Sequence, residues 1–534
     1  MQKIFFKLRR FIFLSNYIRI ILYFIFLSVF TIQLQSQWLD AYIPDFKVND
    51  DNLNSYQTNS QLGVDSGGNF VIVWNDVRGL PGSSYPGKLY FQRYNKFGSP
   101  LNGNILVSND TIGAPQISVL PDGRFILLWL KDFRANGGIQ YYEFVYQRFD
   151  NVGQPIGIIR TVLDTAYTVS STPSSLDISS DINGNFIVCW TRSHFFNSPD
   201  ILYFRKFDST GNRIGLPDSI NIIPYSIENA DIQMNDNGSF IIVWEDNRFS
   251  NPGKKDVFFQ RYNLYGEKIG LNTKINDENN PDINQIGAQV STDGNGYFAV
   301  TWIDSRNGQT GMYYQMFDSS GGTININRKA DEHTAFGYAG IPRISMRKDK
   351  NFYIAWLDVR YTGKDQFYGR RFDSIGNPIG NAYMIPANSP GSSVQIPNDI
   401  YLFNDRVYST WHDNRNAGSV NYDIYCNVRG FQNPDTVIGI VNNSEIIKDY
   451  RLYPAFPNPF NPETKIKFDI PKLSHVKITI FDILGREVTT LINEVKEPGY
   501  YESIFYGSMY SSGIYFYRFE SDYYVDSKKM VLIK

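Results

Sequence analysis

The chain has 534 residues, a formal net charge of −2, 16% aromatic residues and only two cysteines. This length allows several domains, or one large repeat array with additional segments. The nearly neutral charge excludes a broad basic surface, so we expect no nucleic-acid partner.

The N-terminus has the pattern of an export signal. Basic residues from Lys3 to Arg19 precede an apolar run, Ile20 to Ile32, which is too short to span a bilayer comfortably. We predict a signal peptide over residues 1–36, with cleavage after Ser36; an uncleaved anchor is the alternative. No later segment is apolar enough to cross a membrane, so we expect no transmembrane helix in the mature chain.

Seven of the eight tryptophans recur at intervals of 54 to 61 residues, and only Trp38 lies outside the series. Such a period predicts one structural unit copied seven times, with each copy needing its neighbours to bury its apolar faces. The seven are Trp74, Trp129, Trp190, Trp244, Trp302, Trp356 and Trp411.

Each copy predicts four short strands. A first strand leads into an Asp-Gly or Asn-Gly hairpin turn, and the second strand ends at the tryptophan, as in Phe70 to Trp74. This second strand is apolar on both faces, which indicates a sheet covered on both sides. A third strand ends in a [DN]-x-x-G turn that precedes the fourth. Stacked four-stranded sheets of this kind are typical of β-propellers, so we predict an all-β fold with a seven-bladed β-propeller over residues 41–431.

The two ends of the array indicate how the ring closes. The seventh copy lacks its fourth strand, whereas Lys47–Asn52, ahead of the first copy, is similar to the fourth-strand segment Lys274–Asn279. We therefore predict that residues from about 45 to 50 supply the outer strand of the last blade. Closure would remove exposed strand edges.

A W-x-D-x-R motif follows the second strand in most copies. Two interpretations are open: a crown of Asp and Arg that grips a polar ligand, or local capping and ion pairing in each blade. We favour the structural role, because a feature present in nearly every blade serves folding. The motif residues besides Trp190 are Trp74, Asp76, Arg78, Trp129, Asp132, Arg134, Trp244, Asp246, Arg248, Trp302, Asp304, Arg306, Trp356, Asp358, Arg360, Trp411, Asp413 and Arg415.

Differences between copies predict a ligand surface on the first three blades. The third copy replaces the motif with a segment that contains Arg192 and His194, and the first two copies have the longest loops, with Tyr85, Tyr141 and Tyr142. Binding residues usually lie on loops.

No G-x-S-x-G, P-loop or HExxH motif occurs, and we predict no catalytic residues, cofactor or metal site. Calcium at the Asn/Asp clusters around Asn49 and Asn276 is an alternative to solvated turns. Cys189 and Cys426 lie in distant copies, so we expect free buried thiols.

The pattern changes after Phe431. Residues 432–449 predict a polar linker, and residues 450–534 predict about seven alternating strands, as in an Ig-like sandwich. Residues 450–534 contain P-N-P-F-N-P, I-F-D-x-x-G-R-E-V, G-I-Y-F-Y-R and a terminal K-M-V-L-I-K, and together these resemble the type A C-terminal sorting domain of type IX secretion (Por) substrates. The matching positions include Pro457, Asn458, Pro459, Asp482, Gly485, Arg486, Gly513, Lys529 and Lys534.

The resemblance implies export to the periplasm, passage across the outer membrane with the type IX machinery as partner, and release or attachment at the cell surface. We therefore expect a secreted or surface-attached binding and adhesion protein, monomeric, with a glycan or protein ligand. The alternative is a secreted polysaccharide hydrolase or lyase with carboxylates at the propeller mouth.

Overall fold

In the computed structural model the chain divides into two compact units, Met1–Asn433 and Pro434–Lys534. The structure describes residues 41–533 except 52–54, 79–86, 135–139, 164–174, 193–199, 221–226, 252, 309, 333–337, 360–363, 387–392, 416–421, 431–448, 456, 473, 497–498 and 508–509. The predicted signal peptide and linker therefore lie outside the described residues, apart from Asp449.

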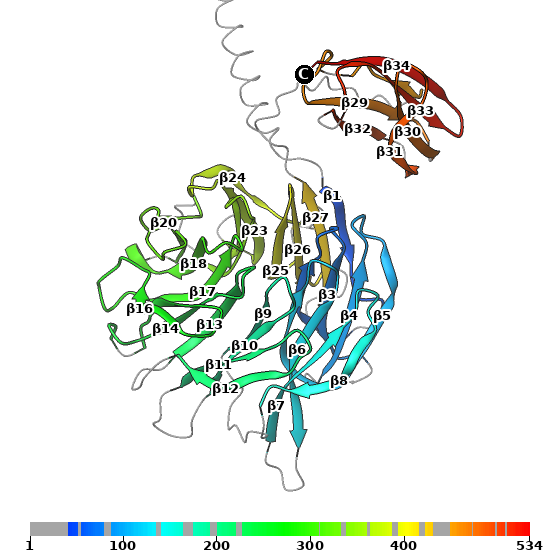
Figure 1. Ribbon diagram of the computed structural model, residues 1–534. Helices are drawn as coiled ribbons and strands as arrows, with labels where there is room; N and C mark the ends of the chain where they lie inside the picture. The colour runs from blue at the N-terminus through cyan, green and yellow to red at the C-terminus, as the bar shows by residue number, and fades with distance from the viewer. Residues whose placement is uncertain are drawn as a thin grey trace, which may run out of the picture. The chain divides into compact units, whose positions relative to one another are not determined.

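The first unit contains five four-stranded antiparallel sheets and one seven-stranded sheet (Figure 1). The seven-stranded sheet contains β2 (Gln57–Val64), β3 (Phe70–Asp76), β4 (Gly87–Tyr94), β5 (Pro100–Val119), β6 (Phe125–Arg134), β7 (Gln140–Phe149) and β8 (Pro155–Thr161). The next two sheets contain β9 (Leu176–Ser180), β10 (Phe186–Arg192), β11 (Ile201–Phe207) and β12 (Arg213–Ser219), and then β13 (Ile227–Met234), β14 (Phe240–Asp246), β15 (Asp256–Tyr262) and β16 (Lys268–Lys274). The last three contain β17 (Gln285–Thr292), β18 (Phe298–Asp304), β19 (Gly311–Phe317) and β20 (Arg328–Lys329); β21 (Ala339–Met346), β22 (Phe352–Asp358), β23 (Gln366–Phe372) and β24 (Pro378–Met384); and β25 (Gln395–Phe403), β26 (Arg406–Asp413), β27 (Asp423–Gly430) and β1 (Ala41–Lys47). A short 3-10 helix, Arg306–Gly308, follows β18.

The seven tryptophans lie on β3, β6, β10, β14, β18, β22 and β26, and all are buried. The first strands of the copies pack side by side in a closed cycle: β2, β5, β9, β13, β17, β21, β25 and again β2. Figure 1 shows the fourth strands, such as β12, β16 and β24, at the rim. The first unit is thus an all-β propeller.

One feature differs from the expected separate four-stranded units. The 20-residue strand β5 pairs with β4 through its first part and with β6 through its second, and so joins the first two copies into one sheet. We interpret this sheet as two blades that share a continuous strand. On that interpretation the ring has the seven blades that the tryptophan count predicts.

The [DN]-x-x-G turn also connects neighbouring sheets. Gly211 has a φ of 81°, as the predicted left-handed turn requires. Arg148 on β7 donates from Nη1 to the Ser209 carbonyl at 2.7 Å, across the joint between the two sheets. A Cβ on Gly211 would lie 3.1 Å from Arg148 Nε, so the glycine leaves room for the arginine as well.

The N-terminal strand β1 pairs with β27, with Phe46 opposite Cys426 and Lys47 opposite Tyr425, so it is the outer strand of the last sheet. The Val48 amide continues the pairing by donating to the Ile424 carbonyl at 2.8 Å. Buried Asp45 accepts hydrogen bonds from Arg415 and Asn427 at 3.1 and 3.0 Å.

The closing sheet repeats the contacts of an internal sheet. Lys47 and Asn49 bind the Asp423 carboxylate at 2.8 and 2.9 Å, as Lys274 and Asn276 bind Asp256 at 2.8 and 2.7 Å. These are the two segments whose sequences match.

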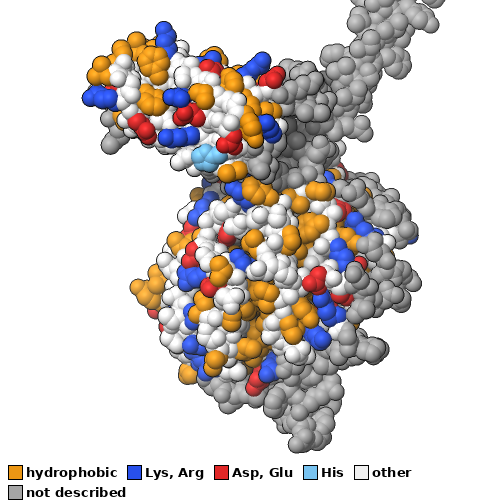
Figure 2. Space-filling view, turned by 90° about the vertical axis from the view of Figure 1, so that its right-hand side faces the viewer, with side chains coloured by type: hydrophobic (Ala, Val, Ile, Leu, Met, Phe, Trp, Pro, Cys, Tyr) orange, Lys and Arg blue, Asp and Glu red, His pale blue; other side chains and the backbone are white. Residues whose placement is uncertain are grey.

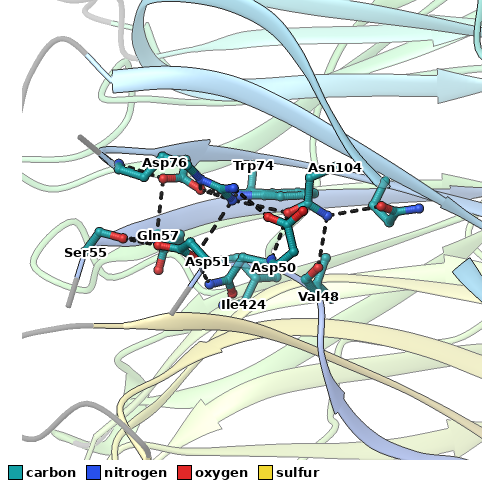
Figure 3. Close-up of polar contacts among 12 residues, drawn as sticks. Val48, Asp50, Asp51, Ser55, Gln57, Trp74, Asp76, Asn104 and Ile424 are labelled. Atoms are coloured by element: carbon teal, nitrogen blue, oxygen red, sulfur yellow. Dashed lines mark hydrogen bonds and ion pairs between the residues drawn. The ribbon is translucent and has the colours of Figure 1, made fainter. Parts of the chain in front are cut away.

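The contacts that join the closing sheet to the next one are drawn in Figure 3, and they recur at an internal joint. At the closing joint Arg78 contacts Asp50 at 2.5 Å, and Asn104 donates to the Val48 carbonyl. At the internal joint Arg306 contacts Asp277 at 2.8 Å in the same way, and Asn327 donates to the Ile275 carbonyl. The ring therefore closes with the chemistry that joins two internal sheets.

The W-x-D-x-R motif forms a clamp within its own sheet. In five copies the tryptophan Nε1 donates to the buried aspartate two residues later, at 2.9–3.2 Å. In four of these copies the arginine pairs with the same aspartate at 2.5–2.7 Å and stacks over a third-strand aromatic ring, 4.3–4.4 Å from its centre. Arg360 and the Asp132 and Arg134 side chains lie outside the described residues. The described contacts are those of a folding element.

We expect Asp304→Ala to lower the free energy of unfolding by roughly 3–5 kcal/mol, because a buried ion pair loses one partner. The change removes the acceptor of the Trp302 indole and of Arg306. Urea unfolding followed by tryptophan fluorescence measures this loss, since seven of the eight tryptophans lie in the propeller and none follows Trp411. The matched control is Asp122→Ala in an exposed pair with Arg124, expected to cost less than about 1 kcal/mol; equal costs would contradict the clamp.

The face of the propeller that Figure 2 shows carries interspersed charges. Figure 2 shows Lys and Arg alternating with Asp and Glu among apolar side chains, without a field of one sign. Several fourth strands expose single aliphatic residues, such as Ile158 and Leu271.

The second unit has two sheets around one apolar core. One contains β28 (Arg451–Leu452), β29 (Glu463–Ile470) and β32 (Gly499–Tyr506), and the other contains β31 (Glu487–Lys496), β30 (Ser474–Phe481), β33 (Gly513–Ser521) and β34 (Val525–Leu532). Ile466, Ile478 and Phe519 are among the core residues. The unit is a β-sandwich, and its assignment as Ig-like stays a prediction.

The P-N-P-F-N-P run and the terminal strand form one structural element. The Asn458 side chain accepts from the Val531 amide at 2.8 Å and donates to the Lys529 carbonyl at 3.3 Å. Phe460 is buried and exchanges backbone hydrogen bonds with Val531 and Ile533. The motif at one end of the domain thus holds the motif at the other; Lys534 lies outside the described residues.

Candidate functional site: the central channel

The first strands of the propeller enclose a central channel of about 1590 Å³. Small-ligand pockets commonly measure ~300–1,000 Å³, so this space admits a ligand larger than one small molecule. Its described walls come from all seven copies, and its two ends differ. We call them the hairpin end, near turns such as Asp65–Asn69, and the loop end, near the W-x-D-x-R clamps.

Seven polar side chains line the channel at one level, one from each copy. Every one of them lies directly opposite the residue that precedes the tryptophan of its copy, and each is partly exposed. We call this set the polar ring, and its members are Gln61, Gln116, Asp177, Asp231, Gln289, Arg343 and Asp399.

A β-bulge precedes the polar ring on several strands. The residue two positions before the ring has a positive φ at Asn59, Asn229, Gly287 and Ile341, where the pairing register shifts. Such bulges re-aim the following side chains and occur often beside functional sites.

The ring aspartates also connect neighbouring sheets. Asp177 accepts from the Ile232 amide at 2.9 Å, Asp231 from Val290 at 2.6 Å and Asp399 from Leu62 at 2.9 Å. Backbone amides at the unpaired edges of these first strands therefore donate to side chains of the preceding sheet. This gives the carboxylates a structural role besides any contact with a ligand.

Burial changes the charge of the ring. It raises the pKa of Asp399 to about 6 against the opposing hydrogen bond from Leu62. Burial also raises the pKa of both Asp177 and Asp231, whose carboxyls are hydrogen-bonded to each other, and the charge of Asp177 adds to the rise at Asp231. Burial lowers the pKa of Arg343, the only base of the ring. The Asp177–Asp231 pair therefore shares a proton readily, and the ring carries less negative charge than its composition indicates.

The two ends of the channel have different chemistry. On the loop side of the polar ring no described lining residue is charged, and Tyr142 and Tyr338 contribute aromatic surface. On the hairpin side lie Asp181, Asp236 and other acids together with Arg347 and Lys348, and Lys348 reaches Asp236 at 2.7 Å. The channel thus runs from a neutral aromatic end to a charged end.

Of the ligand residues predicted on the first three blades, the structure describes the side chains of Tyr142 and Arg192. Tyr142 lies on β7, is buried and forms part of the channel wall, instead of standing on an exposed loop. Arg192 ends β10, half-buried, and is not among the described lining residues. Tyr85, His194 and the Tyr141 side chain lie outside the described residues, so their roles stay predictions.

The polar ring was missed in the sequence, although a signal exists. Each member stands 12 or 13 residues before its tryptophan, at a position that is Gln, Asp or Arg in every copy. No group of three His, Cys, Asp or Glu side chains suited to a metal occurs among the described residues. Both cysteines are free and buried.

Residues 454–534 match the family described as the secretion system C-terminal sorting domain. The second unit is a C-terminal sorting domain. The sorting domain marks the chain as a substrate of type IX secretion, delivered to the cell surface or secreted. No helix in the described part of the chain is long and apolar enough to cross a membrane.

The remaining comparisons concern the propeller. No curated protein matches the chain. Similar solved structures include a protein of unknown function from Dyadobacter fermentans (11% identity, 73% of this chain, 98% of that chain, TM-score 0.44). Others are the polysaccharide lyase Uly1 (13%, 75% and 95%, TM-score 0.46) and the β-propeller domain of the Trilobed protease from Pyrococcus furiosus (12%, 72% and 98%, TM-score 0.42).

Proposed function

We propose that the exported propeller is a glycan-binding protein, used in binding and adhesion at the cell surface or after release, and that its central channel holds the ligand. The polar ring is the observation that carries this proposal. Amide, carboxylate and guanidinium groups at one level offer both donors and acceptors to sugar hydroxyls, and the exposed Tyr338 on the loop side provides surface for a sugar face.

The alternative, a polysaccharide hydrolase or lyase, rests on the three ring aspartates. Glycosidases hold their two carboxyls about 5–5.5 Å or about 6.5–9.5 Å apart, to leave room for the sugar or a water. Each of these three carboxylates is held by a backbone amide of the next sheet, and Asp177 and Asp231 also interact with each other. We therefore favour binding without cleavage.

The test blocks the channel from within. Gln61→Trp fills the ring at a side chain that has no hydrogen-bond partner among the described residues, so we expect the affinity of the mature protein for a bound polysaccharide to fall at least about tenfold. The control Ile158→Trp adds the same bulk at the exposed rim and should change nothing. Equal binding by both variants would contradict a channel site. New reducing or unsaturated ends in the polysaccharide would establish the enzyme instead.

A further inference from the structure

Arg343 is the cation of the polar ring, and part of its guanidinium makes no hydrogen bond within the described part of the chain. Arg343 donates from Nε to the Asn398 carbonyl at 2.5 Å and from Nη1 to the Pro342 carbonyl at 2.8 Å. Its Nη2 has no hydrogen-bond partner among the described residues, and the side chain lines the channel, half-buried. Two N–H groups of a fixed guanidinium are therefore available to a ligand.

The backbone that carries Arg343 is strained in a way that fixes its direction. Ile341 has a φ of 50°, an unusual value for a β-branched residue. The register of β21 against β22 shifts between Gly340 and Arg343. Strain of this kind persists where the surroundings over-determine it, often at ligand sites.

The neighbours of Arg343 limit the charge of the ligand. Asp399 on the next sheet and Asp231 across the channel act on the guanidinium through space, and neither forms an ion pair with it. An anionic ligand that reached Arg343 would face these carboxyls, and a cationic ligand that reached them would face Arg343. A hydroxyl can accept from the guanidinium and donate to a carboxylate, so neighbouring hydroxyls satisfy both without net charge.

We propose that the polar ring recognises two adjacent hydroxyls of an uncharged sugar residue, with one accepting from Arg343 Nη2 and the other donating to Asp399. This inference rests on the proposed function and names its ligand class. The neutral loop end, with Tyr142 and Tyr338, receives the rest of the same chain. Arg343 and Asp399 act as ligand contacts, and the strained bulge at Ile341 positions the first of them.

The test uses the mature protein and five polysaccharides of known chemistry. Mannan and dextran are uncharged and carry adjacent hydroxyls, internal residues of laminarin are uncharged and lack them, polygalacturonate is acidic and chitosan is basic. We expect binding to mannan or dextran, and a loss of at least about tenfold after periodate oxidation and borohydride reduction, which destroy adjacent hydroxyl pairs. Arg343→Met should lower the affinity for the untreated polymer by a similar factor and leave the affinity for the treated polymer unchanged.

Two matched measurements keep the outcomes separate. Gln289→Met removes another ring side chain, whose recorded hydrogen bond is to the neighbouring Ala288 carbonyl, and should change affinity less than Arg343→Met. An unchanged urea midpoint shows that each variant is folded. Three results would overturn the inference and leave the proposed function intact. They are channel binding that survives periodate treatment, a preference for polygalacturonate or chitosan, and an affinity that Arg343→Met does not change. Absence of binding to all five polymers overturns both.

Discussion

A chain that lacks residues 41–51 is expected to lose most of the ~5–15 kcal/mol that stabilises a folded domain. The deletion removes the outer strand of the last sheet, its pairing with β27 and the buried contacts of Asp45 with Arg415 and Asn427. It also exposes the edge of β27, which favours aggregation. Urea unfolding followed by tryptophan fluorescence, with light scattering for aggregation, measures the effect.

Strand complementation makes this prediction specific. A synthetic peptide of residues 41–51 should restore the urea midpoint of the truncated chain, and the same peptide with Asp45→Ala should restore it less, because Asp45 makes the buried contacts. Asp50→Ala is the matched control: Asp50 pairs with Arg78 but is 54% exposed, so we expect a change below about 1 kcal/mol. A truncated chain that unfolds at the midpoint of the full chain would show that β1 does not close the propeller.

The parts of the fold that follow from the sequence are those in which every copy performs the same task. The Trp302–Asp304–Arg306 clamp and its counterparts recur because each sheet must satisfy the same buried indole and carboxylate. The match between Lys47–Asn52 and Lys274–Asn279 identified the closing segment, because both bind the same kind of buried aspartate.

The continuous strand β5 could not be predicted in this way. Its central part continues from the pairing with β4 into the pairing with β6, with a φ of 87° at Gly113. Whether a connection bends away or continues as a strand depends on how two sheets lie against each other. That geometry is not encoded in the local pattern of either copy.

The polar ring was predictable in position but not in direction. Periodicity places Asp177 or Arg343 at a fixed distance from the tryptophan. On several strands a bulge precedes it, at residues such as Asn229 and Ile341, and the local pattern does not reveal such a bulge. Loop length favoured Tyr85 and Tyr141 as ligand residues, and that expectation stays a prediction.

Truncation after residue 449 is expected to abolish release from the cell and to retain the propeller in the periplasm, because the sorting domain is then absent. The two units are compact on their own, so the remaining propeller should keep its urea midpoint. Immunoblots of periplasmic, surface and medium fractions measure the redistribution. Undiminished amounts of truncated protein outside the cell would refute the role of the domain.

A pair of single substitutions tests the same domain at the level of its fold. Asn458→Ala removes the side chain that holds Lys529 and Val531 of the terminal strand, at an expected cost of about 1–2 kcal/mol, and should reduce export. Asn461→Ala is the matched control, because this exposed asparagine also precedes a proline and its side chain bonds to no residue in the described part of the domain. Hydrogen exchange of β34 reports the loosening. If Asn458→Ala alone loosens β34 and lowers the exported amount, export depends on the contact between the two motifs. Equal export of the two variants would mean that the machinery recognises the terminal residues without that contact.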